Sequence, residues 1–339
     1  MTVRVGINGF GRIGRNFLRV VLGTGADIEI VALNDITDAA TNAHLLRYDS
    51  TYGKLGGVSA EEDAIVVQGR RISVLSEREP SKLPWKDLGA DVVVESTGRF
   101  TKRGAAAAHL DAGARRVLIS APAGDADATF VMGVNDSEFD PERHFVVSNG
   151  SCTTNCFVPM VKVVDDAFGI VGGLMTTVHG YTNDQNLLDL PHRDLRRARA
   201  AAVNIVPTTT GAARATSLVL QSMKGKLDGE ALRVPVVDGS ITDFTAVVPR
   251  AVTVDDVNRA FEDASGSGPL SKVLDYTDEP IVSTDIIGRA ASVTFDSKLT
   301  MVMPVSDSST MVKVHGWYDN EWGYSNRLVD MVVLLGSVG

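Results

Sequence analysis

VRVGINGFGRIG, residues 3–14, begins as an alternating apolar run and continues into three glycines with the spacing G-x-G-x-x-G. The apolar run predicts a strand over 3–7, and a helix is expected to begin near Arg12. In this arrangement the first glycine permits a tight turn, the second lets the backbone approach a pyrophosphate, and the third allows close packing of helix on strand. The stretch therefore predicts a dinucleotide-binding βαβ unit.

A glycine motif alone is a weak signal, because ordinary turns also contain glycine. Here a second predicted strand, 28–34, ends at Asn34-Asp35, about 20 residues beyond the glycines. A carboxylate at this point can accept hydrogen bonds from the adenosine ribose, and it would repel the 2′-phosphate of NADP. The sequence thus favours NAD as cofactor. Asp35 could also cap the turn before Thr37, and the two roles are compatible.

The pattern of apolar runs predicts two domains. Up to residue 150, strands (further ones at 91–95 and 117–120) alternate with helical stretches at 17–22 and 102–112, which predicts a parallel Rossmann sheet in an α/β domain over 1–150. After residue 150, a helix over 153–168 is followed by strands without regular helices between them, at 174–178, 231–237, 240–248, 293–294 and 310–317. This predicts an α+β catalytic domain over 151–317 with a mixed, mostly antiparallel sheet. A terminal helix within 318–339 is expected to complete the first domain, and 264–269 is expected to be a surface loop.

Composition excludes several function classes. The net charge of −9 is spread along the 339 residues, which argues against general nucleic-acid or anionic-membrane binding. The start of the chain lacks signal-peptide features, and the late apolar run 331–335 is too short to span a bilayer. The two cysteines, Cys152 and Cys156, are too few for a disulfide framework and have no metal-site spacing. We expect a cytoplasmic protein without a bound metal.

Cys152 lies where a predicted strand turns into a helix, in the segment NGSCTTNC, 149–156. A helix N-terminus favours the thiolate, so the pKa of this thiol is expected to lie below its free value, near ~8.5. The polar neighbours suit an anion pocket, and Cys152 is a candidate nucleophile. A buried, inert thiol is the alternative, and it is the expected role of Cys156, one turn further into the helix.

His179 follows the strand 174–178 directly and is the best-placed histidine to act as base. The sequence alone does not bring it to Cys152. His44, His109, His144 and His192 are predicted to be solvated, and His315 to lie in a strand. A dense basic cluster follows, with Arg193, Arg196, Arg197 and Arg199.

Six blocks in order give the chain a specific resemblance. NGFGRIGR, SNGSCTTNC, TTVHGYTNDQ, TTTGAAR, LRVP and WYDNEWGYSNR span nearly its whole length. On these blocks the sequence resembles the glyceraldehyde-3-phosphate dehydrogenase family, and Leu190-Pro191 is similar to the NAD-using members.

The resemblance implies functional residues. It implies Cys152 as nucleophile and His179 as base and hydrogen-bond donor. It implies anion sites for triose phosphate and inorganic phosphate formed by Ser151, Thr153, Thr182, Arg197, Thr210, Gly211 and Arg233. It implies NAD contacts from Gly9, Gly11, Arg12, Ile13, Asp35, Arg78, Thr97, Ser120 and Asn320. A one-residue shift would put Arg196 or Arg199 in place of Arg197.

The reaction implied is phosphorylating oxidation of D-glyceraldehyde 3-phosphate to 1,3-bisphosphoglycerate through a thioester, by a homotetramer, in glycolysis or gluconeogenesis. Two alternatives remain open: an erythrose-4-phosphate dehydrogenase, and a non-catalytic NAD-binding thiol redox sensor. One departure from the family pattern is Gly150, where alanine is usual. It is expected to loosen the turn that presents Cys152.

Overall fold

The computed structural model describes residues 2–337, and these fold as two compact units. The first unit comprises the chain up to Phe130, Glu138–Gly150 and the segment from Ser325 onward. The second comprises Val131–Ser137 and Ser151–Tyr324.

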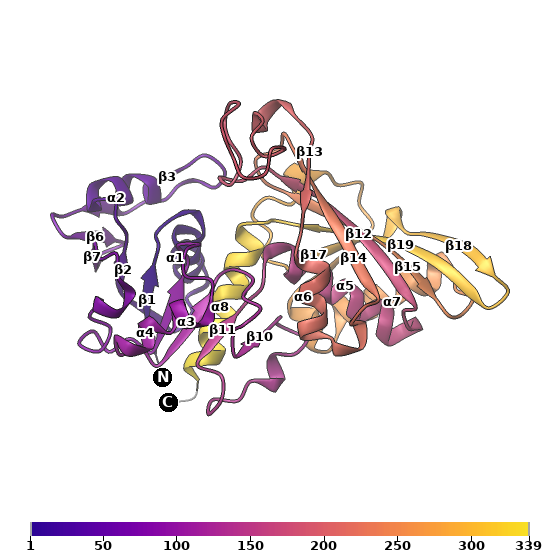
Figure 1. Cartoon of the computed structure of the whole chain (residues 1–339), viewed down its shortest axis with the longest axis horizontal. Helices are drawn as coiled ribbons and strands as arrows, with labels where there is room; N and C mark the ends of the chain where they lie inside the picture. The colour runs from indigo at the N-terminus through magenta and orange to yellow at the C-terminus, as the bar shows by residue number, and fades with distance from the viewer. Residues whose placement is uncertain (1, 338–339) are drawn as a thin grey trace. The chain divides into compact units, whose positions relative to one another are not determined.

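The first unit is built on a largely parallel sheet. Among the described residues this sheet has nine strands in the order β10-β11-β9-β8-β1-β2-β7-β6-β5 (Figure 1). The strands are β1 (Val3–Asn8), β2 (Ile28–Asn34), β5 (Val58–Ala60), β6 (Ala64–Val67), β7 (Arg70–Leu75), β8 (Val92–Glu95), β9 (Arg116–Ile119), β10 (Ala128–Thr129) and β11 (Val146–Ser148). β6 pairs antiparallel with both β5 and β7 and belongs to an edge that was not predicted, whereas the other pairs of this sheet are parallel. A short hairpin, β3 (Tyr48–Asp49) and β4 (Gly53–Lys54), lies outside this sheet.

Helices connect the strands of this unit. They are α1 (Arg12–Thr24), α2 (Ala39–Arg47), α3 (Arg103–Ala106) and α4 (Ala108–Asp111). α1 buries Phe17, Leu18, Val20 and Val21 and ends at Gly25, whose φ of 65° is the left-handed conformation that glycine adopts without strain. The helical stretch predicted over 102–112 is confirmed, and it is divided into two short helices at Ala107.

The second unit contains a mixed sheet. Its strands are β12 (Gly172–Gly180), β13 (Val206–Thr209), β14 (Leu227–Val234), β15 (Ser240–Val248), β16 (Leu274–Thr277), β17 (Val293–Asp296), β18 (Met301–Ser306) and β19 (Ser309–Tyr318). Among the described residues the order is β13-β14-β12-β15-β19-β17-β16, and β18 pairs with β19. Only the β12–β14 and β16–β17 pairs within it are parallel. The predicted fold class, a Rossmann α/β domain plus an α+β domain with a mostly antiparallel sheet, is confirmed.

Helices cover one face of this sheet. α5 (Cys152–Phe168), α6 (Ala212–Val219) and α7 (Val254–Gly266) bury their apolar sides with alternate residues of the strands, in a core that includes Phe157, Phe244 and Phe295. α7 was not predicted, and it runs through the first part of the expected loop 264–269. The last helix, α8 (Trp322–Gly336), belongs to the first unit from Ser325 onward, where Arg116 donates to the Leu335 carbonyl at 3.1 Å.

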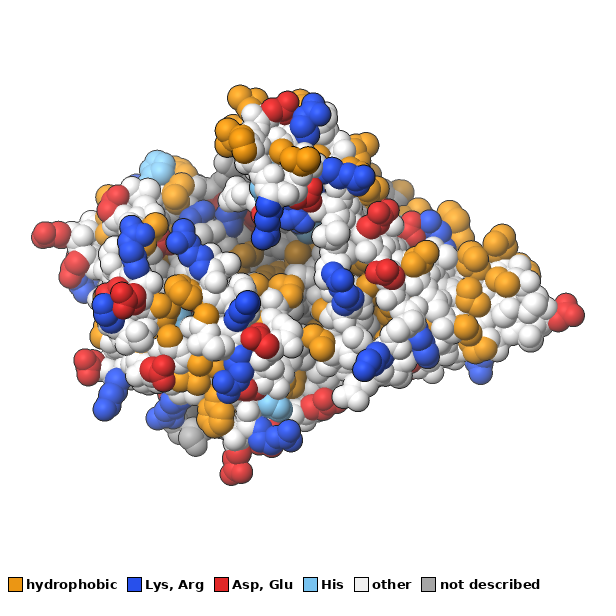
Figure 2. Space-filling view, in the orientation of Figure 1, with side chains coloured by type: hydrophobic (Ala, Val, Ile, Leu, Met, Phe, Trp, Pro, Cys, Tyr) orange, Lys and Arg blue, Asp and Glu red, His pale blue; other side chains and the backbone are white. Residues whose placement is uncertain are grey.

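The other face of the second sheet is open in a single chain. Leu174 on β12 is 67% exposed, and Met301 and Met303 on β18 are 57% and 56% exposed. Figure 2 shows apolar side chains gathered on the β18–β19 hairpin and on the loop that precedes β13. This loop carries Leu187 and Leu195, which are also exposed.

Candidate functional site

Cys152 is the first residue of α5. Ser151 caps the helix, and its Oγ accepts a hydrogen bond from the backbone N–H of Thr154 at 3.0 Å. The Cys152 side chain is half-buried, whereas Cys156, one turn further, is fully buried with its Sγ 3.6 Å from the Gly316 carbonyl oxygen. Cys156 is therefore a core residue, and Cys152 is the thiol available for chemistry.

His179 is the penultimate residue of β12, and the fold brings it to Cys152. Its Nε2 lies 3.4 Å from the Cys152 Sγ, and its Nδ1 lies 2.7 Å from the Gly180 carbonyl oxygen. In the tautomer that donates from Nδ1 to this carbonyl, the lone pair of Nε2 faces the sulfur. The arrangement is that of a thiol beside a base that can take its proton.

The charge state of the pair departs from the expectation. Burial, together with the positive charge of Arg233, lowers the pKa of His179 to about 3, so the imidazole is neutral at pH 7. Burial also raises the pKa of the Cys152 thiol, although the charge of Arg233 and the hydrogen bonds from Thr153 act to lower it. The predicted depression of the Cys152 pKa is wrong for this arrangement, because loss of water around the sulfur outweighs the favourable charges.

Arg233 lies beside His179 on the neighbouring strand. β12 and β14 run parallel with His179 opposite Arg233, and the Arg233 guanidinium contacts the imidazole Nδ1 and donates to the Gly180 carbonyl at 3.0 Å. Burial lowers the pKa of Arg233, but the group stays cationic at neutral pH. It places a fixed positive charge directly beside the imidazole of the thiol–imidazole pair.

Arg197 is the member of the basic cluster that turns inward. Its Nε and Nη2 donate to the Thr208 Oγ1 at 2.8 and 2.6 Å, and its Nη1 pairs with Asp184. Arg197 also lies close enough to Arg233 for its charge to lower the Arg233 pKa. Arg199, by contrast, is exposed and pairs with Asp189. Thr208 and Asp184 were missed, since nothing in the sequence shows which partners an arginine cluster meets.

The remaining predicted anion-binding residues surround this core of the second unit. Thr153 is buried, with its Oγ1 2.9 Å from the Tyr318 hydroxyl. Thr182 follows the end of β12, and its N–H donates to Gln185. Thr210 and Gly211 follow β13 and are tied to the start of α6, where the Thr210 Oγ1 accepts from the Ala212 N–H. Arg233 contacts His179, Thr153 hydrogen-bonds the Cys152 thiol, and Ser151 precedes Cys152 in the chain. Arg197 reaches this group only through the effect of its charge on Arg233, and the other three residues lie on adjoining loops.

A pocket of about 440 Å³ in the first unit lies at the carboxyl ends of its parallel strands. Its lining includes five of the predicted cofactor residues, Gly9, Gly11, Asp35, Arg78 and Thr97. Other predicted residues have different surroundings. Arg12 pairs with Asp49 at 2.9 Å, Ser120 donates to the Glu95 carbonyl at 3.0 Å, Ile13 lies in the first turn of α1, and Asn320 belongs to the second unit.

The three glycines of the motif meet the geometry that a dinucleotide requires. Gly9 has a φ of 93°, and a Cβ on it would lie 2.6 Å from the Thr97 nitrogen. Gly11 has open space on the side where a Cβ would stand, and a Cβ on Gly14 would lie 2.3 Å from the Gly9 carbonyl oxygen. Asp35 accepts hydrogen bonds from the N–H groups of Phe10 and Thr37, so it braces the glycine loop as well as the following turn. The pocket therefore fits the phosphates of NAD at the start of α1.

A buried polar network beneath this pocket was missed. The Glu95 carboxylate, 2% exposed, accepts hydrogen bonds from Asn8, from His109 and from both the N–H and the hydroxyl of Thr97. The Trp85 indole N–H donates to His109 Nδ1 at 2.9 Å, which leaves the His109 proton on Nε2. The predicted solvation of His109 is wrong: the side chain is fully buried. An apolar helix position gives no sign that its histidine meets a buried acid.

Gly150 precedes the helix cap with a φ of 64°, a conformation in which alanine would be strained. Its predicted effect on the turn that presents Cys152 stays a prediction.

Within residues 2–337, no cluster of three or more His, Cys, Asp or Glu is arranged to hold a metal ion. No helix in that part of the chain has the length and apolar character needed to cross a membrane.

Two family models match the chain. Residues 3–103 match the NAD binding domain of glyceraldehyde 3-phosphate dehydrogenase, and residues 151–320 match its C-terminal domain. The chain is 62% identical over 338 residues to a glyceraldehyde-3-phosphate dehydrogenase of Streptomyces coelicolor, covering 99% of each chain. It is 60% identical over 344 residues to one of Mycobacterium avium, again with 99% of each chain covered. On this similarity, together with the thiol–imidazole pair and the dinucleotide pocket, the chain belongs to the glyceraldehyde 3-phosphate dehydrogenase family.

Proposed function

We propose that this protein oxidises D-glyceraldehyde 3-phosphate with NAD and inorganic phosphate to 1,3-bisphosphoglycerate, through a thioester on Cys152. The observation that carries the proposal is the 3.4 Å approach of the His179 Nε2 to the Cys152 Sγ, with Arg233 against the same imidazole. The domain of residues 1–150, completed by 318–339, holds the cofactor, and the domain of 151–317 carries the reacting thiol.

Proton transfer within the pair starts the cycle. The neutral His179 takes the thiol proton through Nε2 as the sulfur attacks the aldehyde carbon, and the resulting imidazolium can donate to the oxyanion of the hemithioacetal. NAD, when bound, supplies the hydride acceptor that turns this adduct into a thioester. The positive charge of Arg233 disfavours the imidazolium, which favours release of the proton from His179. Inorganic phosphate then attacks the thioester, and the Cys152 sulfur leaves.

Two anions, the substrate phosphate and the attacking phosphate, need separate positive sites. Arg233 and Arg197 supply the charge: Arg233 lies against His179, and Arg197 is near enough for its charge to act on Arg233. Ser151, Thr153, Thr182, Thr210 and Gly211 supply hydroxyl and N–H donors. Thr208 and Asp184 hold the Arg197 guanidinium in one orientation.

NAD would be held by the pocket of the first unit. The N–H groups at the start of α1, beyond Gly9 and Gly11, would bind the pyrophosphate, and Asp35 the adenosine ribose. Arg12, Ile13, Arg78, Thr97 and Ser120 complete this set, and Asn320 would bind the nicotinamide amide.

The test is NADH formation with glyceraldehyde 3-phosphate, with and without inorganic phosphate. We expect phosphate-dependent turnover that Cys152→Ser abolishes while NAD binding persists. Arg197→Ala should raise the KM for triose phosphate or phosphate at least tenfold, whereas Arg199→Ala, the matched control, should leave both unchanged. Faster turnover with erythrose 4-phosphate would instead favour that dehydrogenase, and peroxide reactivity without turnover would favour a redox sensor.

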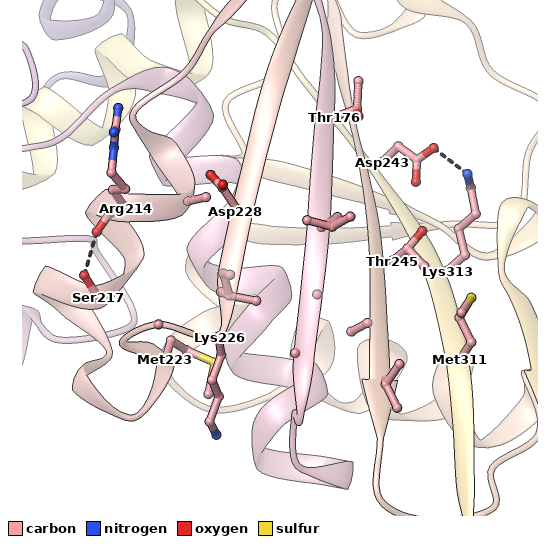
Figure 3. A pocket seen from close by; sticks show the side chains of 18 residues that line it. Thr176, Arg214, Ser217, Met223, Lys226, Asp228, Asp243, Thr245, Met311 and Lys313 are labelled. Atoms are coloured by element: carbon pink, nitrogen blue, oxygen red, sulfur yellow. Dashed lines mark hydrogen bonds and ion pairs between the residues drawn. The ribbon is translucent and has the colours of Figure 1, made fainter. Parts of the chain in front are cut away.

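We further propose a homotetramer in the cytoplasm, where a reducing environment keeps the Cys152 thiol free. A second copy of this chain is the partner that the open sheet face fits. A hollow of about 920 Å³ on it is lined by residues of β12, β15 and β19, among them Thr176, Thr245 and Lys313, and Figure 3 shows Lys313 paired with Asp243 there. Leu174→Glu on this face is expected to dissociate the assembly, which sedimentation analysis would measure.

A further inference from the structure

Ser240 is a buried hydroxyl at the start of β15 that lies between two parts of the proposed site. It is 1% exposed, and its Oγ accepts a hydrogen bond from the Gly180 N–H at 3.1 Å. The same Oγ donates to the Asn320 Oδ1 at 2.7 Å. The direction of both hydrogen bonds is fixed, because the backbone N–H can only donate and the amide oxygen can only accept. The serine hydroxyl therefore accepts from Gly180 and donates to Asn320.

On one side of Ser240 lies the base. Gly180 follows His179 directly, and its carbonyl oxygen accepts from Arg233 and lies 2.7 Å from the His179 Nδ1. A Cβ on Gly180 would stand 3.0 Å from the Val236 carbonyl oxygen and 3.5 Å from the Asn320 Oδ1. The Gly180 backbone is thus packed directly against Asn320, so a shift of the Gly180 backbone would also move the Asn320 side chain.

On the other side lies the amide of Asn320, which is 6% exposed. With the Oδ1 engaged by Ser240, the two N–H bonds of Nδ2 are the groups that the amide can offer to a ligand. Without the hydroxyl, the amide could rotate by half a turn and present its oxygen instead.

We propose that Ser240 is a positioning residue that fixes the Asn320 amide as a hydrogen-bond donor toward the nicotinamide carboxamide and ties it to the peptide that follows His179. The inference rests on the proposed function, since it assumes that Asn320 meets the nicotinamide. Ser240 acts through the two groups that it contacts, the Gly180 N–H and the Asn320 amide. It keeps the Asn320 amide at a fixed position relative to His179.

The test compares the affinity for NAD with that for ADP-ribose, which lacks the nicotinamide. In Ser240→Ala we expect the dissociation constant of NAD to rise about fivefold to tenfold, the effect of one lost hydrogen bond, while that of ADP-ribose stays unchanged. Ser297→Ala is the matched control, because Ser297 is also buried and bonds a carbonyl, that of Thr277, at 2.8 Å. It should change neither affinity.

A double-mutant cycle completes the test. In an Asn320→Ala background the substitution at Ser240 should no longer weaken NAD binding. Equal losses for both ligands, no loss for NAD, or the same loss without the Asn320 amide would each overturn the proposal. Should Ser240→Ala fail to fold, Ser240→Cys fills the site with a slightly larger side chain and replaces the hydroxyl by a weak hydrogen-bonding group, with the same expectations.

The failure of this inference can be told apart from a failure of the proposed function. If the native protein shows no phosphate-dependent NADH formation, the reaction assignment falls, while the ratio of the two affinities still reports on Ser240. If turnover is normal and the ratio is unmoved in Ser240→Ala, only the role of Ser240 falls.

Discussion

Removing the charge of Arg233 tests how the thiol is tuned. Arg233→Gln keeps a polar side chain of similar reach but deletes the cation that lies against the His179 imidazole. The positive charge of Arg233 acts to lower the pKa of both Cys152 and His179. Its removal should therefore raise both pKa values.

The size of the effect follows from the geometry. The sulfur is 3.4 Å from Nε2, and the guanidinium lies across the imidazole ring. The charge is then roughly 7 Å from the sulfur, and with an effective dielectric constant of about 20 the interaction is about 2 kcal/mol. An interaction of this size corresponds to about a thirtyfold factor in the acid dissociation of the Cys152 thiol.

The assay is the rate of alkylation by iodoacetamide as a function of pH. This reagent is neutral, so the change in protein charge does not alter its approach to the thiol. The midpoint should move upward, and at a pH below the midpoint the reaction should slow about tenfold or more. Arg199→Gln, which deletes an exposed and distant guanidinium, is the control. An unmoved or lower midpoint in Arg233→Gln would refute the electrostatic reasoning.

Three further outcomes are expected. Gly14→Ala places a methyl group 2.3 Å from the Gly9 carbonyl oxygen, so it should lower the free energy of unfolding by about 1–3 kcal/mol and weaken NAD binding. Gly23→Ala, in the same helix, has open space and should stabilise the protein by up to ~1 kcal/mol. Urea unfolding measures the stability of each variant, and NAD titration measures its affinity. Glu95→Gln replaces one oxygen of a buried carboxylate that accepts four hydrogen bonds by an amide nitrogen, which can only donate, so two of the four donors lose their acceptor. The change should cost about 2–4 kcal/mol in the same unfolding assay, and a cost near zero would contradict the assigned network. Burial acts to raise the pKa of Asp127, but Arg103 and the N–H groups of Val146 and Phe145 hold it below its usual value. Because the folded pKa is depressed, the ionised Asp127 stabilises the fold above about pH 4, and this contribution is lost as the pH falls through the folded pKa. Asp127→Asn should therefore be less stable than the native protein at pH 7 and equally stable in strong acid.

Local pattern was sufficient for the elements that carry the site. The alternation of 3–7 and the glycines that follow predicted β1, the turn and the start of α1, because each glycine answers a steric demand within a few residues. The helix predicted over 153–168 begins one residue earlier, at Cys152, and the bounds of β15 agree with the prediction, since a cap or a two-residue period is a local property. Elements with weaker patterns, such as β5 to β7 and α7, escaped prediction.

The pairing of residues distant in sequence was decided by the tertiary structure. Nothing near His179 in the sequence shows that the end of β12 meets the start of α5, or that the register of β14 puts Arg233 opposite the imidazole. The inward turn of Arg197 and the burial of His109 against Glu95 depend likewise on partners tens of residues away. Family resemblance could name several of these residues, but it gave no geometry for them.

The charge state of the thiol shows the division most clearly. The sequence determined that Cys152 begins a helix, and from this alone a depressed pKa was expected. The fold added the burial of the sulfur and of His179, whose desolvation cost depends on every atom that excludes water around them. A helix terminus is a local cause that a sequence displays, whereas desolvation is set by the whole packed surroundings, and these exist only once the chain has folded.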